Sequence, residues 1–191
     1  MPRKKDKAPR AHQEIKENVK KGLIIVHTGN GKGKSTAAFG TAIRAMGRGD
    51  QVAIVQFIKG PWKTGEEKFF KGLRGRCQFW PMGKGFTWDT LDFEKDVKTA
   101  GRAWEKCCEF LHDQRHQLVI FDEINYALQY NFLDLQKVLA QLKNKPPLKH
   151  VILTGNGAPA ALVALADLVT EMRCIKHPYK QGIKAQAGIE Y

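Results

Sequence analysis

The chain has 191 residues, of which 42% are hydrophobic, and it carries 32 Lys and Arg against 19 Asp and Glu, for a formal net charge of +13. This length favours a single domain, the hydrophobic fraction excludes a disordered chain, and no apolar run approaches the ~20 residues of a transmembrane helix, so we expect no membrane partner. The basic excess would suit nucleic acid, an anionic surface or a polyphosphate substrate, and composition does not choose among them.

The N-terminal segment differs in composition from the rest. Residues 1–21 hold eight basic and three acidic side chains, which supply +5 of the net charge, and contain too few apolar residues to fold alone. This predicts a basic tail, with room for a short helix over 11–21, followed by one domain over residues 22–191. The cysteines have the spacing of neither a disulfide framework nor a zinc site, and no secretory signal precedes them, so we expect a cytoplasmic setting. They are Cys77, Cys107, Cys108 and Cys174.

Apolar runs of strand length recur after the tail and alternate with stretches of helical spacing. This alternation predicts an α/β fold with a mostly parallel central sheet flanked by helices. The runs span residues 23–27, 51–57, 77–80, 118–121 and 150–153, with a weaker one over 168–175. The clearest helix has apolar residues at steps of three and four over 97–111, which makes Trp104 and the Cys107–Cys108 pair core candidates. Another helix is predicted to begin at Asp134 and to stop before Pro146.

A glycine-rich loop lies between the first apolar run and a helical stretch, which is the context of a P-loop. Glycines let backbone N–H groups curl around phosphate oxygens, and the helix start adds partial positive charge. Lys34 would reach the phosphate chain, and the Ser35 hydroxyl would ligate magnesium. Thr28 stands where the common motif opens with glycine, so the loop is a variant. The predicted ATP-binding residues are Thr28, Gly29, Asn30, Gly31, Lys32, Gly33, Lys34, Ser35 and Thr36.

The run over 118–121 ends in two carboxylates, Asp122 and Glu123. In P-loop proteins a carboxylate at such a strand end holds the magnesium ion, directly or through water. Alone, this pair would be more typical of a solvated turn, and the glycine-rich loop could be an ordinary turn, but the two elements support each other. We therefore predict that one carboxylate belongs to a metal site with Ser35 and that the other is a second ligand or a base.

Residues 59–84 combine seven basic with five aromatic side chains, and two more aromatics, Phe86 and Trp88, follow beside glycines. Phe86 and Trp88 would point to the same side of an extended segment, so a flat ligand could pack against both. The same composition fits a solvated face with scattered core aromatics, or the stacking of nucleic-acid bases. We interpret His112 and His116 as a solvent-facing pair on the long helix rather than as metal ligands.

With these motifs in place, residues 22–191 resemble the ATP-dependent corrinoid (cobalamin) adenosyltransferases of the P-loop type. The aromatic loop and the C-terminal Lys-Ala-Gln…Gly-Ile-Glu-Tyr ending are much more selective than the P-loop itself. Further matching segments are residues 56–60, 64–66, 122–123, 153–155 and 166–172. The resemblance implies a single-domain RecA-like P-loop NTPase fold.

The resemblance also implies transfer of the 5′-deoxyadenosyl group from ATP to the Co(I) centre of a corrinoid, with release of inorganic triphosphate, in adenosylcobalamin biosynthesis or salvage. ATP would lie reversed relative to ordinary NTPases, so that its ribose 5′-carbon faces the cobalt. Phe86 and Trp88 would bind the lower axial face of the corrinoid and ease formation of Co(I). The implied catalytic residues are Lys34, Phe86, Trp88 and Glu123, and the implied metal is Mg²⁺ or Mn²⁺ on Ser35, Asp122 and Glu123.

The implied partners are a second copy of the chain, in a homodimer, and a transient reductase such as an acidic flavodoxin, which the basic surface would suit. Asn156 stands where we expect an arginine in relatives, and Ser35 replaces the commoner threonine but keeps the hydroxyl. The tail matches only loosely a segment that in relatives folds over the corrinoid site of the partner subunit, and a loose tail fits equally well.

Two other functions stay open from the sequence. A RecA-like ATPase on single-stranded nucleic acid would use the basic aromatic segment for stacking and would release phosphate. A nucleotide-binding module would bind ATP without turnover. We favour the transferase and do not expect nucleic acid as a partner, and only the transferase predicts triphosphate and a cobalt–carbon bond.

Overall fold

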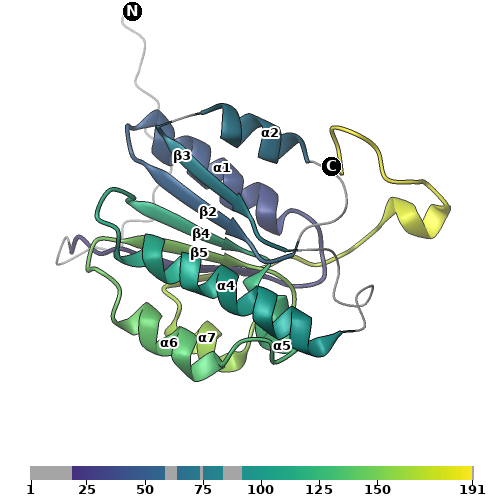
Figure 1. Ribbon diagram of the computed structural model, residues 1–191. Coiled ribbons are helices and arrows are strands. Elements are labelled where there is room, and N and C mark those ends of the chain that lie inside the picture. Colours follow the sequence, from purple (N-terminus) through teal and green to yellow (C-terminus); the bar gives the residue numbers. More distant parts are fainter. Residues whose placement is uncertain (1–18, 59–63, 74, 84–91, 191) are drawn as a thin grey trace, which may run out of the picture.

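Six parallel strands form one sheet in the computed structural model, which describes residues 19–58, 64–73, 75–83 and 92–190 (Figure 1). The strand order is β3-β2-β4-β5-β1-β6, and every neighbouring pair is parallel. The predicted α/β class and parallel sheet are confirmed. The strands are β1 (Ile24–Thr28), β2 (Val52–Gln56), β3 (Cys77–Pro81), β4 (Leu118–Asp122), β5 (His150–Thr154) and β6 (Leu168–Glu171).

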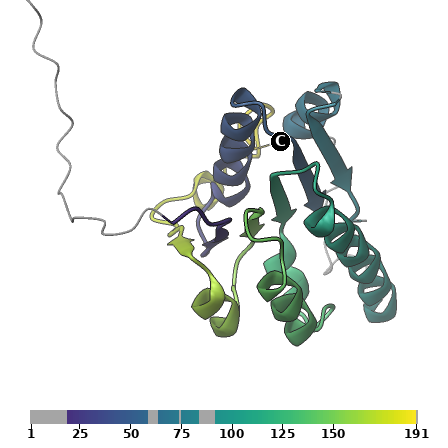
Figure 2. The ribbon, with the colours of Figure 1, turned by 90° about the vertical axis from the view of Figure 1, so that its left-hand side faces the viewer.

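Helices cover both faces of this sheet (Figures 1 and 2). One apolar cluster joins α1 and α2 to one face, and a larger one joins α4, α5, α6 and α7 to the other. Alternate residues of a strand face opposite sides of the sheet. Because helices cover both sides, β2 and β4 are buried along their whole length. The helices are α1 (Lys34–Gly47), α2 (Gly65–Gly72), α4 (Phe93–His112), α5 (Ile124–Gln129), α6 (Leu135–Lys143), α7 (Ala160–Leu165) and the 3₁₀ turn η1 (Pro178–Gln181).

The structure confirms some of the local predictions and corrects others. Asp134 caps α6, as predicted, and its carboxylate accepts hydrogen bonds from two backbone N–H groups. On α4, Cys107 is buried, whereas Trp104 and Cys108 are only partly so. The solvent-facing histidine pair is wrong for His116, which lies beyond the end of α4 and is 2% exposed. The chain turns there to enter β4, and the turn places the imidazole edge-on against the Phe110 ring. Within the described ranges, no helix has the length and apolar character needed to cross a membrane.

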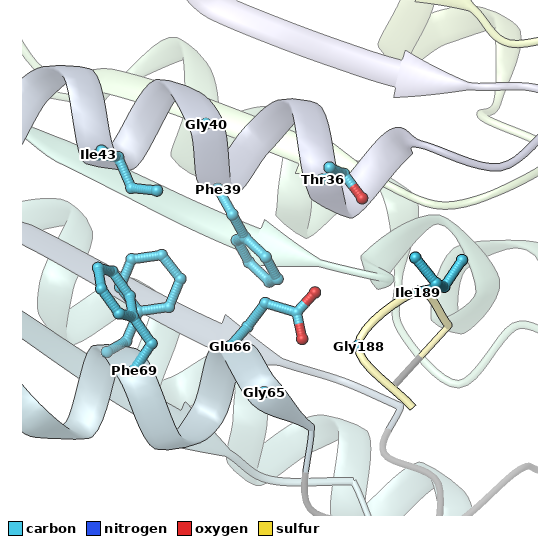
Figure 3. Close-up of a pocket in the computed structure, with 10 residues that line it drawn as sticks. Thr36, Phe39, Gly40, Ile43, Gly65, Glu66, Phe69, Gly188 and Ile189 are labelled. Atoms are coloured by element: carbon cyan, nitrogen blue, oxygen red, sulfur yellow. The ribbon is translucent and has the colours of Figure 1, made fainter. Parts of the chain in front are cut away.

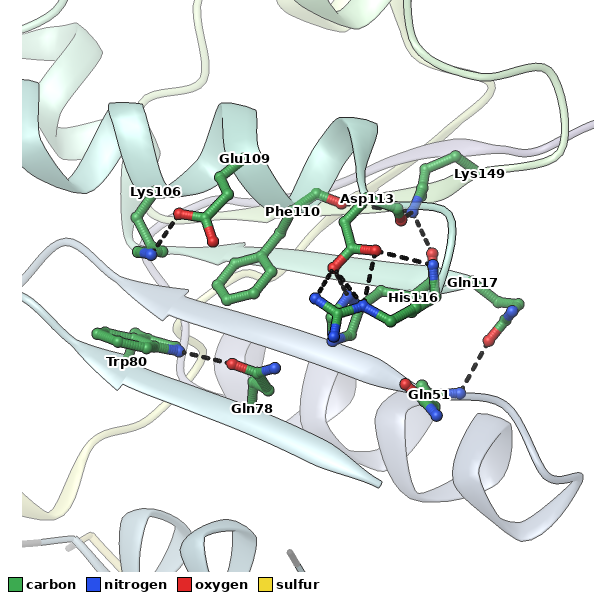
Figure 4. Close-up of polar contacts among 11 residues, drawn as sticks. Gln51, Gln78, Trp80, Lys106, Glu109, Phe110, Asp113, His116, Gln117 and Lys149 are labelled. Atoms are coloured by element: carbon green, nitrogen blue, oxygen red, sulfur yellow. Dashed lines mark hydrogen bonds and ion pairs between the residues drawn. The ribbon is translucent and has the colours of Figure 1, made fainter. Parts of the chain in front are cut away.

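A buried lysine lies against the end of α4 (Figure 4). It precedes β5, whereas the P-loop follows the parallel strand β1, so the two lie at opposite edges of the sheet. Lys149 is 5% exposed, and its Nζ donates hydrogen bonds to the carbonyls of Phe110 (3.3 Å), Asp113 (2.6 Å) and His116. The last carbonyls of a helix lack partners within the helix, so this ammonium group satisfies acceptors that would otherwise be buried unpaired. The charge is therefore structural, although burial lowers the pKa of Lys149.

Replacing Lys149 with methionine keeps the apolar stem and removes the donor. Because an unsatisfied buried polar group costs about 1–3 kcal/mol, the free energy of unfolding of Lys149→Met should fall by at least about that amount in urea denaturation. Lys137→Met, on the exposed face of α6, is the matched control and should change little. Equal stability of the two variants would contradict the capping role.

Acidification should destabilise the fold through His116. Burial lowers the pKa of His116 from the usual 6.5. The Asp113 carboxylate, whose Oδ2 lies 3.1 Å from His116 Nδ1, raises this pKa, whereas the charges of Lys149 and Arg115 lower it further. Below pH 6.5 the unfolded chain therefore binds a proton that the folded chain does not, and stability is lost as the pH falls from 6.5 towards the lower folded pKa. Urea denaturation at pH 7 and pH 5 should show a smaller loss for His116→Phe than for the wild type. An unchanged loss would contradict this origin.

Candidate functional site

Four loops meet at the carboxyl edge of the sheet, where parallel α/β proteins place their ligand sites. The P-loop follows β1, and Gln56, Asp122 and Thr154 are the last residues of the neighbouring strands β2, β4 and β5. Gln56 and Asp122 are register partners across β2 and β4. The order of the strands therefore brings three polar side chains from distant parts of the chain against the phosphate loop.

Asp122 is the centre of this arrangement. Its carboxylate is 1% exposed and accepts hydrogen bonds from Gln56 Nε2 (2.9 Å, to Oδ2), from Thr154 Oγ1 (2.7 Å, to Oδ1) and from the Ser35 side chain. Burial raises the pKa of Asp122, and these three donors lower it. The donors favour the ionised carboxylate and fix its orientation towards the P-loop.

Glu123 sits in a strained backbone conformation. Its φ of 64° lies in the left-handed region, which a side chain with a Cβ rarely adopts. Thr154 Oγ1 accepts a hydrogen bond from Glu123 N–H (2.9 Å) and so holds this turn. Glu123 Oε2 is buried without a hydrogen-bond partner among the described residues. Burial and the neighbouring Asp122 raise the pKa of Glu123 to about 7, while Lys34 lowers it.

The P-loop wraps around its own lysine. The Lys34 Nζ donates hydrogen bonds to the carbonyls of Gly29 (2.9 Å) and Gly31 (2.8 Å). Burial lowers the pKa of Lys34, and the charges of Glu123 and Asp122 act against that shift. Lys34 is also the first residue of α1, so the helix N-terminus and the ammonium group direct positive charge to the same space.

The chain segment that follows β6 forms hydrogen bonds with the P-loop. Gly31 N–H donates a hydrogen bond to the Met172 carbonyl (2.7 Å), and Cys174 N–H donates one to Asn30 Oδ1 (3.0 Å). Gly29 has φ 93°, and a Cβ there would lie 2.4 Å from the Met172 carbonyl oxygen. Glycine is therefore required by both backbone conformation and space at this position. Farther along, Glu190 forms an ion pair with Lys32.

Two cavities open beside the loop. The first, of about 500 Å³, is the P-loop pocket, and it is lined by residues 30–36, Asp122, Glu123, Gln56, Tyr126 and Glu190, among others. The second, of about 440 Å³, is apolar and lies between α1 and α2 (Figure 3). Phe39, Ile43 and Phe69 line it, with Ile189 of the C-terminal segment at one end and the Glu66 carboxylate beside it.

Most of the residues predicted for the site come together in the P-loop pocket. The described lining includes Asn30, Gly31, Lys32, Gly33, Lys34, Ser35, Thr36, Asp122 and Glu123. Thr28 and Gly29 are not part of this lining, and Thr28 Oγ1 accepts a hydrogen bond from Ala158 N–H (3.1 Å). Asn156 follows β5 and is half-buried. Phe86 and Trp88 lie outside the described residues.

Sequence reasoning assigned no role in the site to Gln56, Thr154 or Tyr126. Gln56 is the second-last residue of the apolar run over 51–57, and Thr154 directly follows the run over 150–153. Their positions near the carboxyl ends of predicted strands were the available signal. Their hydrogen bonds to Asp122 could not be inferred from the sequence, because they depend on the order of the strands. Tyr126 follows the carboxylates by one helical turn, on α5, and faces the same pocket.

A family model described as "ATP:corrinoid adenosyltransferase BtuR/CobO/CobP" matches residues 20–191. The chain belongs to this family. A corrinoid adenosyltransferase of Sinorhizobium sp. is 49% identical over 98% of this chain and 88% of its own length. Those of Pseudomonas aeruginosa and Escherichia coli K12 are 46% and 42% identical, over 90% and 94% of this chain and 84% and 95% of their own lengths. The nucleic-acid ATPase is not favoured.

A solved structure shares the adenosyltransferase's fold at low sequence identity. The flagellar accessory protein FlaH of Methanocaldococcus jannaschii aligns with a TM-score of 0.50 and 18% identity, over 80% of this chain and 72% of its own. This likeness supports the RecA-like α/β fold.

The donors at this edge suit a magnesium ion bound together with nucleotide phosphates. Mg²⁺ prefers oxygen ligands and is usually held by one or two carboxylates plus substrate phosphates rather than by an all-protein cage. The adenosyltransferase offers the Ser35 hydroxyl, the Asp122 carboxylate and the unpartnered Glu123 Oε2. The described residues contain no cluster of three or more His, Cys, Asp or Glu side chains that could hold a metal without a ligand's help.

Thr154 should position both carboxylates of the adenosyltransferase. Thr154→Val keeps the side-chain shape but leaves Asp122 Oδ1 and Glu123 N–H without this partner, so we expect a loss of about 1–3 kcal/mol in the free energy of unfolding, together with weaker binding of ATP in the presence of Mg²⁺. Thr154→Ser retains the hydroxyl and should restore most of both. Calorimetry and urea denaturation measure the two effects. A valine variant that matches the wild type in both would disprove this role.

Proposed function

We propose that this protein transfers the 5′-deoxyadenosyl group of ATP to the Co(I) centre of a corrinoid and releases inorganic triphosphate. The observation that carries the proposal is the convergence of the P-loop with Asp122 and Glu123 in one pocket, in a chain of the corrinoid adenosyltransferase family. Co(I) is a strong nucleophile, so the protein's task is to position the 5′-carbon and to stabilise charge growing on the triphosphate.

Lys34 and the loop N–H groups would stabilise that charge. The two carbonyls that bind the Lys34 ammonium group keep it beside the pocket, and an incoming phosphate oxygen would be a stronger, charged acceptor for the same donor. The α1 N-terminus adds partial positive charge at the same point. These contacts strengthen as negative charge develops on the leaving group and therefore favour the transition state.

A Mg²⁺ or Mn²⁺ ion would be held by Ser35 and Asp122, with Glu123 as a second ligand or as a base. Such an ion supplies charge neutralisation on the phosphate oxygens. The three donors on Asp122 keep that carboxylate oriented for this role. Burial raises the pKa of Glu123, so a nearby cation would favour the ionised form of this side chain.

The remaining assignments complete this proposal. Phe86 and Trp88 would bind the lower face of the corrinoid and exclude water from it, residues 1–21 would be a basic tail and residues 22–191 the catalytic domain. We further propose that the chain forms a homodimer. We also propose an acidic flavodoxin-like reductase as a transient partner, and the net charge of +13 supports that partner. A cytoplasmic location suits the four free cysteines. Acceptors for the test are cobalamin, cobinamide and cobyrinic acid diamide.

The proposal is tested anaerobically with ATP, Mg²⁺ and chemically reduced Co(I) cobalamin. The Co(I) absorption band should disappear as a photolabile alkylcobalamin forms, and Lys34→Ala should slow this by roughly 10²-fold or more. Lys137→Ala, on the exposed face of α6, is the control and should react like the wild type. Folded wild type that forms no alkylcobalamin, and instead releases ADP and phosphate faster with single-stranded DNA, would establish the alternative ATPase.

A further inference from the structure

Asn125 is a fully buried amide beside the site, and stability alone does not explain it. It is the second residue of α5 and is 0% exposed. Its Nδ2 donates a hydrogen bond to the Gly155 carbonyl (2.8 Å), whereas its Oδ1 is buried without a hydrogen-bond partner among the described residues. A buried acceptor without a partner lowers stability, and a leucine of similar size would avoid that cost.

Gly155, the partner of this amide, packs directly on the start of α5. Its φ of 124° lies in the range that favours glycine. A Cβ at this position would lie 3.0 Å from Asn125 Cβ and 3.4 Å from Glu123 Oε2. The first of these distances is shorter than an ordinary contact between carbon atoms. The loop after β5 can therefore approach Asn125 and Glu123 this closely only because a glycine stands there.

These contacts surround the strained backbone of Glu123, which directly precedes α5. A left-handed conformation at a residue with a Cβ persists only where the neighbouring structure holds it. Thr154 Oγ1 accepts the hydrogen bond from Glu123 N–H, and the Asn125–Gly155 hydrogen bond ties the first turn of α5 to the next residue of the same segment. Two consecutive residues, Thr154 and Gly155, thus hold the two ends of the turn over residues 123–125.

The two carboxylates of the site are held in different ways. Asp122 accepts hydrogen bonds from three side chains, which fix its orientation directly. Glu123 Oε2 has no hydrogen-bond partner among the described residues, although Glu123 lines the P-loop pocket. The position of this oxygen therefore depends on the backbone of Glu123 and on the packing of Gly155 against it. Both depend on how α5 is attached to the loop after β5.

We propose that Asn125 is a positioning residue for Glu123: by tying α5 to Gly155, it holds the Glu123 carboxylate at the P-loop pocket in the orientation that the metal–triphosphate complex requires. This inference rests on the proposed function, in which Glu123 is a metal ligand or a base. It adds the residue that keeps Glu123 in place. Loss of Asn125 should therefore reduce what the metal contributes to ATP binding and to transfer, and should leave the contacts of Lys34 with the phosphates intact.

The test replaces Asn125 with leucine, which keeps the volume and removes both the donor to Gly155 and the unpaired acceptor. Calorimetry on the whole chain measures ATP affinity with Mg²⁺ and with EDTA. The ratio of the two affinities should fall roughly tenfold or more, while the affinity in EDTA stays close to wild type. With Co(I) cobalamin, kcat should fall by a similar factor and KM for cobalamin should change little. The electron paramagnetic resonance signal of Mn²⁺ bound with ATP should change as well.

Gly155→Ala is the second variant, because its Cβ would push against Asn125 and Glu123, and it should lower the same affinity ratio. Its control is Gly182→Ala, which has a similarly positive φ of 74° but no atom within 4 Å of the added Cβ. Val138→Ala, a buried position on α6, controls for loss of stability. Both control variants should keep the wild-type affinity ratio, kcat and Mn²⁺ signal.

The two hypotheses fail in different ways. Wild type that forms no alkylcobalamin, or whose ATP affinity does not respond to Mg²⁺, would overturn the proposed function. Active, Mg²⁺-responsive wild type whose Asn125→Leu and Gly155→Ala variants keep the affinity ratio and kcat would overturn the positioning role alone. An Asn125→Leu variant that loses stability in urea, and loses ATP affinity equally with Mg²⁺ and with EDTA, would show a purely structural residue and would equally contradict the proposal.

Discussion

The buried carboxylate of Asp122 is the interaction on which the geometry of the site depends. A carboxylate that is 1% exposed is costly unless donors surround it, and here Gln56, Ser35 and Thr154 provide them from three separate elements. These bonds join β2, the start of α1 and β5 to the end of β4. The network aligns the P-loop with the strand ends, and Thr154 extends it to the strained backbone of Glu123. A substitution that breaks it should disturb nucleotide binding and folding together.

Charge in the P-loop pocket is balanced in a way that suits a polyanion and its cation. Lys34 and the N-terminus of α1 contribute positive charge, and Asp122 and Glu123 contribute two acidic groups within electrostatic range of Lys34. Burial raises the pKa of both carboxyl groups, so a nearby cation favours their ionised forms. A triphosphate would interact with Lys34 and the N-terminus of α1, and a divalent ion bound to it would interact with the two carboxylates. The pocket is thus suited to holding the leaving group.

Local sequence patterns were sufficient for the strands, the P-loop and the carboxylate pair, because each has a short period or fixed spacing. They were insufficient where a contact depends on strand order or on the path of a turn. Thr154 and Gln56 lie at or beside the carboxyl ends of ordinary apolar runs, and only the order β2-β4-β5 makes them partners of Asp122. The Lys32–Glu190 ion pair joins residues 158 positions apart. His116 was misassigned because the turn after α4, which buries it, has no helical or strand periodicity.

The central claim is that the P-loop pocket holds the triphosphate as a leaving group and presents the ribose 5′-carbon for attack by cobalt. ATP labelled with ¹³C at the 5′ position tests it most directly, with NMR of the corrinoid product and ³¹P NMR of the phosphate product after a single turnover. The account predicts that the label becomes bonded to cobalt and that one intact triphosphate forms per cobalt. Label retained in ADP, with inorganic phosphate released, would contradict it.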